Sequence, residues 1–350
     1  MGIFTKVSGQ DRAQFANNLS VMLKSGIPID QSLLTLADQA NSSYLKKAIT
    51  SVSDDVKNGT LLSVAFAKEE KAFGAIFVSL IAAGEESGTL RENLSFLADW
   101  FERSADLTRE VKGAILYPKL VLSASLLLGC ALSVFILPRL IPLFNQLDVE
   151  LPLITRALMA ASVFLQTKWI WCVLVCIGAF FLFRVLNRLA TVRRLLDRVQ
   201  LFLPFIGPIL VQYQLALITQ LFATLLHSGL PITRAIGVVE EAISNTYFKE
   251  SIEAMERNVV AGRVLSEALI AYPKLYPKMC IGIVSVGEQS GALADSFSYL
   301  SQYYTKQVKS KAKQLPTIIE PLLLVFIAMI VGLVALAIVL PIYKLTGSIN

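Results

Sequence analysis

Residues that could carry out chemistry are few in this sequence, and they do not form a catalytic set. The chain contains one histidine, His227, directly before Ser228 and Gly229. Its place before a turn is typical of a cation that ends a helix. With this single histidine, the chain has no base for a nucleophilic triad and no second histidine for a metal site. No Gly-x-x-x-x-Gly-Lys-Ser/Thr loop occurs, so we expect neither ATP hydrolysis nor another enzymatic activity.

Acidic residues offer two further candidate sites. Glu85 and Glu86 lie in one glycine-rich segment, and Glu288 lies in a similar one. They could contact a cation or a partner, but we favour a simpler interpretation in which the glycines and serines shape a helix corner and the acids face water. Glu320 stands beside Pro321 before an apolar run, where an acid is costly unless it lies at the interface or is paired.

The cysteines indicate neither a disulfide framework nor a zinc site. Cys130, Cys172 and Cys176 lie in apolar runs, Cys280 lies in a helical soluble stretch, and no Cys-x-x-Cys occurs. We therefore expect no metal and no cofactor.

Three long apolar runs divide the chain that carries these residues. The sequence has 350 residues, 55% hydrophobic and only 17% charged, whereas soluble proteins carry about 25% charged residues. The uncharged runs are 120–137, 169–183 and 321–343. A membrane helix needs about 20 apolar residues, so each run with its flanks predicts a span. For the shorter second run, a buried core helix is the alternative.

Basic residues set the expected orientation through the positive-inside rule. Thirteen lie on the side that we assign to the cytoplasm: Arg103, Arg109, Lys112, Lys119, Arg184, Arg188, Arg193, Arg194, Arg198, Lys306, Lys309, Lys311 and Lys313. Four lie opposite: Arg139, Arg156, Lys168 and Lys344. The net charge of +6 thus follows the membrane ends, which favours contact with anionic lipid over nucleic acid. The polar start of the chain predicts no cleavable signal peptide.

A repeat at a fixed offset of 203 residues runs through the chain. Ser25-Gly26-Ile27-Pro28 returns as Ser228-Gly229-Leu230-Pro231, and Gly84-Glu85-Glu86-Ser87-Gly88-Thr89-Leu90 returns as Gly287-Glu288-Gln289-Ser290-Gly291-Ala292-Leu293. The pairs Gly59 and Gly262, Ser63 and Ser266, and Pro118 and Pro321 have the same spacing. A register without gaps over about a hundred residues indicates a duplication.

Each copy reads as a helical bundle. Phe15, Leu19 and Leu23 recur every four residues and form an apolar stripe. Gly26 is expected to end a helix in the left-handed conformation, with Pro28 beginning the next. Gly88 is expected to end another helix, and Thr89 with Glu92 predicts a capping box for the helix that follows.

The predicted fold is all-α, a membrane protein with three transmembrane helices and two homologous cytoplasmic helical bundles. The expected segments are a first bundle at 1–112, a span at 113–139, a periplasmic loop at 140–167, a span at 168–187, a second bundle at 188–314, a span at 315–343 and a periplasmic tail at 344–350. The second span has no counterpart in the repeat and provides the return crossing.

The two Ser-Gly-x-Pro turns, the two Gly-Glu-x-Ser-Gly-x-Leu motifs and the three spans resemble the F-family inner-membrane platform proteins of type II secretion and type IV pilus machines. The resemblance covers about Asp11 to Tyr343. It implies a scaffold in the bacterial inner membrane, with a cytoplasmic N-terminus, that couples a cytoplasmic assembly ATPase to insertion of pilin or pseudopilin subunits. Implied partners also include other inner-membrane assembly proteins and further copies of the chain.

Our hypothesis is that the bundles move as rigid bodies about hinges at 112–118 and 313–321. The candidate structural and partner-contact residues are Ser25, Gly26, Pro28, Gly84, Glu85, Ser87, Gly88, Pro118, Ser228, Gly229, Pro231, Gly287, Glu288, Ser290, Gly291, Glu320 and Pro321. A small oligomeric transporter is the alternative function, although three spans with so few polar groups scarcely supply a midplane site. A membrane enzyme would need a catalytic pair, which the lone histidine does not provide.

Overall fold

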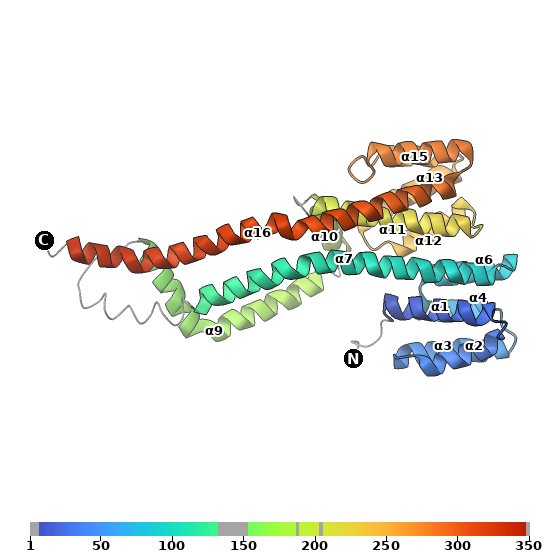
Figure 1. The fold of residues 1–350 in the computed structure, drawn as a ribbon, viewed down its shortest axis with the longest axis horizontal. Helices are drawn as coiled ribbons and strands as arrows, with labels where there is room; N and C mark the ends of the chain where they lie inside the picture. The colour runs from blue at the N-terminus through green and yellow to red at the C-terminus, as the bar shows by residue number, and fades with distance from the viewer. Residues whose placement is uncertain (1–6, 132–152, 187–188, 203–205, 348–350) are drawn as a thin grey trace. The chain divides into compact units, whose positions relative to one another are not determined.

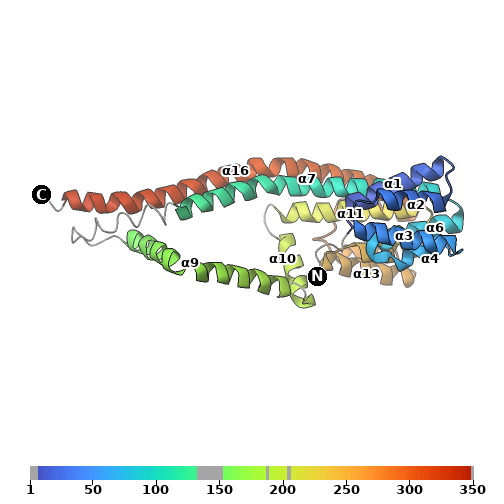
Figure 2. The ribbon, with the colours of Figure 1, turned by 90° about the horizontal axis from the view of Figure 1, so that it is seen from below.

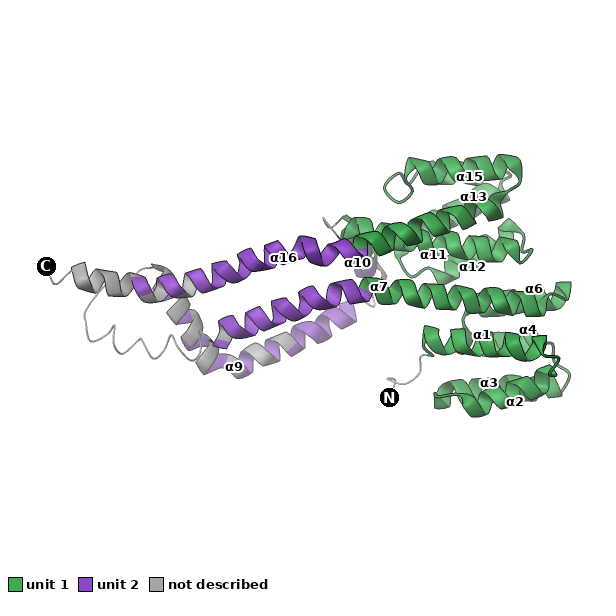
Figure 3. Ribbon diagram, in the orientation of Figure 1, with its two compact units in different colours: residues 1–111, 194–311 green, residues 112–193, 312–350 purple. Residues whose placement is uncertain are grey.

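The computed structural model describes residues 7–131, 153–186, 189–202 and 206–347, and this part of the chain is helical without strands. The expected segments that lie outside it are 132–152, which holds the end of the first span and the start of the loop, and the short stretches 1–6, 187–188, 203–205 and 348–350. Two compact units divide the chain: one holds 1–111 and 194–311, and the other holds 112–193 and 312–350 (Figure 3).

Helices of the first repeat follow one another with short turns (Figure 1). They are α1 (Gly9–Lys24), α2 (Ile29–Gln39), α3 (Ser43–Lys57), α4 (Leu62–Lys68), α5 (Glu70–Phe73), α6 (Ala75–Ser87) and the start of α7 (Leu90–Ala131). Four phenylalanines, Phe15, Phe66, Phe73 and Phe77, meet in the core, with ring centroids 4.8–6.1 Å apart. Burial of these large side chains is the main stabilising term of the bundle.

Helices of the second repeat match the first nearly residue for residue. They are α11 (Gly207–His227), α12 (Ile232–Ala242), α13 (Thr246–Val260), α14 (Leu265–Ile270), α15 (Lys278–Ser290) and the start of α16 (Leu293–Gly347). α2 and α12, α3 and α13, and α6 and α15 begin and end at positions 203 apart. The duplication inferred from the sequence is therefore a duplication of structure.

Glycine turns end the first helix of each repeat in the same way. Gly26 and Gly229 have φ of 79° and 85°, in the left-handed region. The N–H of Ile27 donates to the Met22 carbonyl at 3.0 Å, and that of Leu230 donates to the Leu225 carbonyl at 3.1 Å. These bonds are those of a Schellman motif, so the expected helix ends are confirmed.

The prolines that follow stand one position earlier than expected. Pro28 and Pro231 are the N-cap residues of α2 and α12, and the first helical residues are Ile29 and Ile232. Their ψ values of 149° and 145° are extended, which explains why the helix begins one residue later. Their carbonyls accept the first helical bonds, from Ser32 and Ala235.

Three helices in the described part of the chain are long and apolar enough to cross a membrane, namely α7, α11 and α16. The most apolar window is 11% buried in α7 and 6% buried in α16, but 56% buried in α11. α11 is a core helix of the second bundle, since residues such as Leu215, Leu221 and Phe222 are fully covered by protein. Burial therefore separates α11 from the two helices that correspond to the first and third predicted spans.

Unit 2 contains the distal parts of α7 and α16 together with α9 (Leu153–Leu186), while α10 (Ala190–Phe202) crosses the unit boundary. Gly129 of α7 approaches Ile330 of α16 so closely that an added Cβ would lie 3.2 Å from its methyl group. Leu127 and Leu324 are 72% and 62% exposed. Such exposed apolar helices fit a membrane protein.

α9 begins within the segment at 140–167 that was expected to connect the first two spans. Residues 153–167 are helical, and Lys168 has the non-helical angles φ −119° and ψ 22°, so α9 is two helices joined at a kink (Figure 2). The apolar composition of 153–165 explains the added helix. The second piece begins where the second span was expected, and that span stays a prediction.

Candidate functional site: the paired helix corners and the contact between repeats

The repeated motif Gly-Glu-x-Ser-Gly-x-Leu forms a corner between two helices in each repeat. In the first copy, Gly88 ends α6 with φ of 73°, and α7 starts at Leu90. In the second, Gly291 ends α15 with φ of 71°, and α16 starts at Leu293. Both glycines adopt the conformation that other residues rarely adopt, as the sequence predicted.

Gly84 and Gly287 allow the two helices of each corner to approach closely. A Cβ on Gly84 would lie 2.8 Å from the Cα of Leu90, and one on Gly287 would lie 2.7 Å from the Cβ of Ser296. Asn93, the counterpart of Ser296, is buried and donates from Nδ2 to the Leu80 carbonyl at 3.0 Å. The glycines are thus required by packing rather than by backbone angles.

Glu85 and Glu288 close each corner by capping a third helix. The Glu85 carboxylate accepts hydrogen bonds from the backbone N–H groups of Leu62 and Ser63, at 2.8 and 3.1 Å, and from the Ser63 hydroxyl. It therefore satisfies the first donors of α4, which otherwise would have no partner.

The second corner repeats this network in full. Glu288 accepts hydrogen bonds from the backbone N–H groups of Leu265 and Ser266, and from the Ser266 hydroxyl at 3.0 Å. The expectation that these acids face water is wrong for Glu85 and Glu288, which are half-buried, while Glu86 is exposed. In the sequence, the recurrence of Ser63 as Ser266 at the repeat offset was the one feature that pointed to this network.

The serines of the motif bond within their own helices. The Ser87 hydroxyl donates to the Ala83 carbonyl at 2.6 Å, and the Ser290 hydroxyl donates to the Val286 carbonyl at 2.8 Å. Ser25 and Ser228 do the same at the ends of α1 and α11, to Val21 and Leu225. These four hydroxyls complete helix ends and carry no catalytic geometry.

The two repeats touch through α6 and α7 on one side and α11 and α12 on the other. α6 contacts α12, and the Glu86 carboxylate lies 3.7 Å from the guanidinium of Arg234. The Thr108 hydroxyl on α7 lies 2.9 Å from the hydroxyl of Tyr213 on α11.

A polar cavity of about 180 Å³ lies along this contact. Its lining comes from α7, α11 and α16 and includes Asp99, Trp100, Arg103, Gln220 and His227. The Nε1 atom of Trp100 is buried without a hydrogen-bond partner, and His227 ends α11 with its Nε2 atom 3.9 Å from the Asp295 carboxylate. His227 thus lies at a helix end, as expected, and also at the contact between the repeats.

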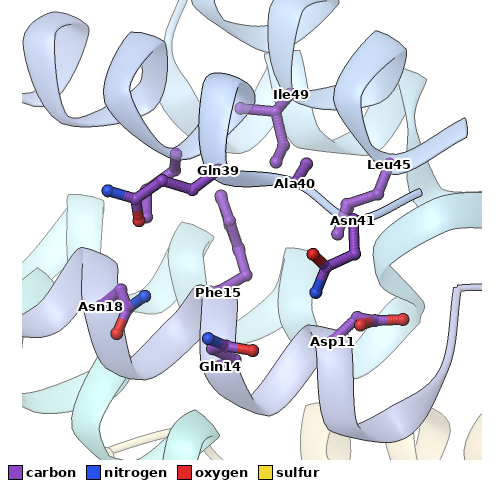
Figure 4. A pocket seen from close by; sticks show the side chains of 10 residues that line it. Asp11, Gln14, Phe15, Asn18, Gln39, Ala40, Asn41, Leu45 and Ile49 are labelled. Carbon is purple, nitrogen blue, oxygen red and sulfur yellow. The ribbon is translucent and has the colours of Figure 1, made fainter. Parts of the chain in front are cut away.

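A smaller pocket of about 40 Å³ is found within the first repeat. Figure 4 shows it between α1 and the turn from α2 to α3, with Asp11, Gln14, Asn18 and Asn41 around it. Asp11 is already engaged in a capping box with Ser8. The positions 203 residues later include Leu217 and Leu221, so this polar lining belongs to one repeat alone.

Burial changes the chemistry of three groups in the second repeat. Burial raises the pKa of the Cys280 thiol to about 12, and it also raises the pKa of the Tyr276 and Tyr304 hydroxyls. Tyr276 lies 2.7 Å from the Ser251 hydroxyl. A thiol held protonated in this way is a poor nucleophile.

The remaining candidates lie on the long helices. Pro118 is inside α7 and buried, whereas Glu320 and Pro321 are exposed on α16. Across the residues that the structure describes, no three histidine, cysteine or acidic side chains come together as metal ligands would. The geometry therefore supports rigid helical corners and a contact between repeats.

Comparison with known proteins gives the same picture. The family model described as type II secretion system (T2SS), protein F, matches residues 15–138 and again 218–341, two stretches 203 residues apart. A type IV pilus assembly protein PilC of Thermus thermophilus is 30% identical over 97% of this chain and 84% of its own length. PilC of Pseudomonas aeruginosa is 28% identical over 100% and 94%, and a type II secretion system protein F of Xanthomonas campestris is 30% identical over 96% and 83%.

Proposed function

Because this chain belongs to the type II secretion system protein F family, we propose that it is the inner-membrane platform of a type IV pilus or type II secretion machine. In this proposal it couples a cytoplasmic assembly ATPase to the insertion of pilin or pseudopilin subunits and catalyses no reaction itself. The observation that carries the proposal is the double family match, whose offset equals that of the paired helix corners.

The corners suit a part that transmits force. Each bundle has three helix ends held by fixed geometry: a Schellman turn, a left-handed glycine and a carboxylate cap. Packed helices with satisfied ends move as rigid bodies about short hinges. The boundaries of the compact units fall after Val111 and after Lys311, next to the hinges proposed at 112–118 and 313–321.

The proposed topology places both bundles in the cytoplasm, where an assembly ATPase is available. The basic residues beside the predicted spans support this orientation. Other inner-membrane assembly proteins and further copies of the chain are proposed as partners within the membrane. Lipid surrounds the exposed apolar faces of α7 and α16.

Co-purification tests this function. The full chain would be purified in mild detergent from its own cells, and its partners identified by mass spectrometry. We expect a hexameric assembly ATPase and pilin-like subunits. If a stable, intact chain recovers neither, the platform proposal fails, and a flux assay in liposomes would then test the small-transporter alternative.

A further inference from the structure

The contact between the two repeats joins different faces of the same bundle. We call the surface of α6 and α7 the front face of the first repeat, and the surface of α11 and α12 the back face of the second. The front face meets the back face through α6 with α12, and through Thr108 with Tyr213. A contact between unlike faces is heterologous, so it leaves one front face and one back face open.

The duplication identifies the two faces that the internal contact leaves open. α15 and α16 form the front face of the second repeat, and α1 and α2 form the back face of the first. Ser298, Ser301 and Gln302 of α16 line the internal cavity, so the open part of this front face is α15 with the side of α16 that carries Tyr299. Among the described residues, the main contacts of α15 and α2 are with helices of their own repeat, α14 for α15 and α1 and α3 for α2. Both helices belong to unit 1 (Figure 3). Each chain therefore presents both halves of a contact that it already makes once.

Apolar side chains on the open faces are more exposed than their counterparts in the covered contact. Val286 and Tyr299 on the open front face are 65% and 56% exposed. Their counterparts, Ala83 and Phe96, are half-buried. Large exposed apolar side chains mark a surface that protein can cover.

The open back face shows the same difference. Val21 and Leu34 are 54% and 41% exposed, while their counterparts Thr224 and Gly237 are half-buried. Thr224 and Gly237 lie on the helices that form the existing contact, and Val21 and Leu34 occupy the same positions on the open face.

The register of the internal contact can be transferred to the two open faces. Glu86 near the end of α6 pairs with Arg234 near the start of α12, so the two helices meet end to start. The same register places Gln289 beside Gln31 and Val286 beside Leu34. The two exposed apolar side chains, Val286 and Leu34, therefore fall opposite each other when the internal contact is repeated between chains.

We propose that the α15–α16 face of one chain binds the α1–α2 face of a second copy, and so repeats between chains the contact found inside each chain. Val286 packs on Leu34, and Gln289 lies opposite Gln31. Each chain gives one face and receives the other, so the assembly is head-to-tail. The inference deepens only the self-association part of the proposed function.

Cysteine cross-linking in membranes tests the proposal with full chains. Two differently tagged chains would be co-expressed, one carrying Gln31→Cys and the other Gln289→Cys, both with Cys130, Cys172 and Cys176 replaced by alanine. A short bismaleimide is expected to give a dimer that contains both tags. Glu86→Cys with Arg234→Cys in one chain is the positive control, because that contact is internal. Leu34→Asp should lower the yield of the dimer by about tenfold, since it buries an unpaired charge.

The proposal is overturned if the internal control cross-links and the mixed pair does not. It is also overturned if Gln31→Cys chains alone cross-link as well as the mixed pair, because the contact would then join like faces. A cross-link from Gln289→Cys to a different protein in place of a second copy would contradict it too. The assay reads contact alone, so it can fail while an assembly ATPase still co-purifies, and the reverse can also occur.

Discussion

The two repeats share a backbone plan but differ in what fills their cores. In the first, Phe73, Phe77 and Phe101 are buried. In the second, the positions 203 residues later hold Tyr276, Cys280 and Tyr304, and Ser251 bonds to Tyr276. The corners, by contrast, keep the same atoms in the same roles. The plan therefore depends on the helix ends, while different side chains fill the two cores.

The largest effect on stability is expected from adding a methyl group at the corner glycines. Gly84→Ala and Gly287→Ala should each destabilise their bundle by about 3 kcal/mol, because the helices cannot separate without losing their packing. Unfolding of the full chain in detergent, followed by pulse proteolysis, measures this.

A second substitution in each repeat tests whether the two corners pack in the same way. The Gly287 clash involves the side chain of Ser296, whereas the Gly84 clash involves the backbone of Leu90. Ser296→Gly should therefore recover part of the loss in Gly287→Ala, and Asn93→Gly should recover none in Gly84→Ala. Equal rescue in both repeats would show that the corners pack alike and would break the comparison.

The next effect concerns the carboxylate caps. Glu85→Ala and Glu288→Ala should each cost about 2 kcal/mol, because each leaves two backbone donors and a hydroxyl without their charged acceptor. The matched control is Glu86→Ala, an exposed neighbour with a change below about 0.5 kcal/mol expected. Unequal losses of stability in Glu85→Ala and Glu288→Ala would show that the same hydrogen-bond geometry does not contribute the same free energy in the two repeats.

A smaller effect distinguishes the cores by their pH dependence. The native state keeps Cys280 protonated up to about pH 12, while the unfolded thiol loses its proton around its ordinary pKa of 9.0. The unfolded state thus binds fewer protons at alkaline pH, and the stability of the second repeat falls as pH rises above about 9, by about 1 kcal/mol at pH 10.

Thermal unfolding at pH 7.5 and pH 10 checks this dependence. The raised pKa values of Tyr276 and Tyr304 act in the same direction. A chain carrying Tyr276→Phe and Tyr304→Phe, the residues of the first repeat, should lose less stability between the two pH values. The account is wrong if both chains lose the same amount.

The smallest effect on folding is expected at the equivalent prolines. Pro118→Ala and Pro321→Ala restore a helical donor at the proposed hinges, so membrane insertion and the stability of the bundles should be kept while the helix at each hinge becomes stiffer. Filament or pseudopilus assembly should nevertheless fall in both. Pro208→Ala is the control, because Pro208 lies in the first turn of α11, outside both proposed hinges. Normal assembly in both hinge variants would refute the hinge hypothesis.

Local features of the fold were readable from the sequence because they depend on neighbouring residues. Gly26, Gly88 and their counterparts specify turns by backbone conformation alone. The role of Glu85 was not readable, since Ser63 lies 22 residues earlier and only the packing of α4 against α6 joins them. The same limit applies to α11, whose apolar composition suits a membrane or a protein core equally.

The most direct test of the central claim is deletion of this chain in its own cells. The platform account predicts that surface filaments or pseudopilus-dependent secretion disappear, while intact pilin-like subunits remain in the inner membrane, and that the wild-type chain restores assembly. Unchanged filaments and unchanged secretion in the deletion strain would contradict the account.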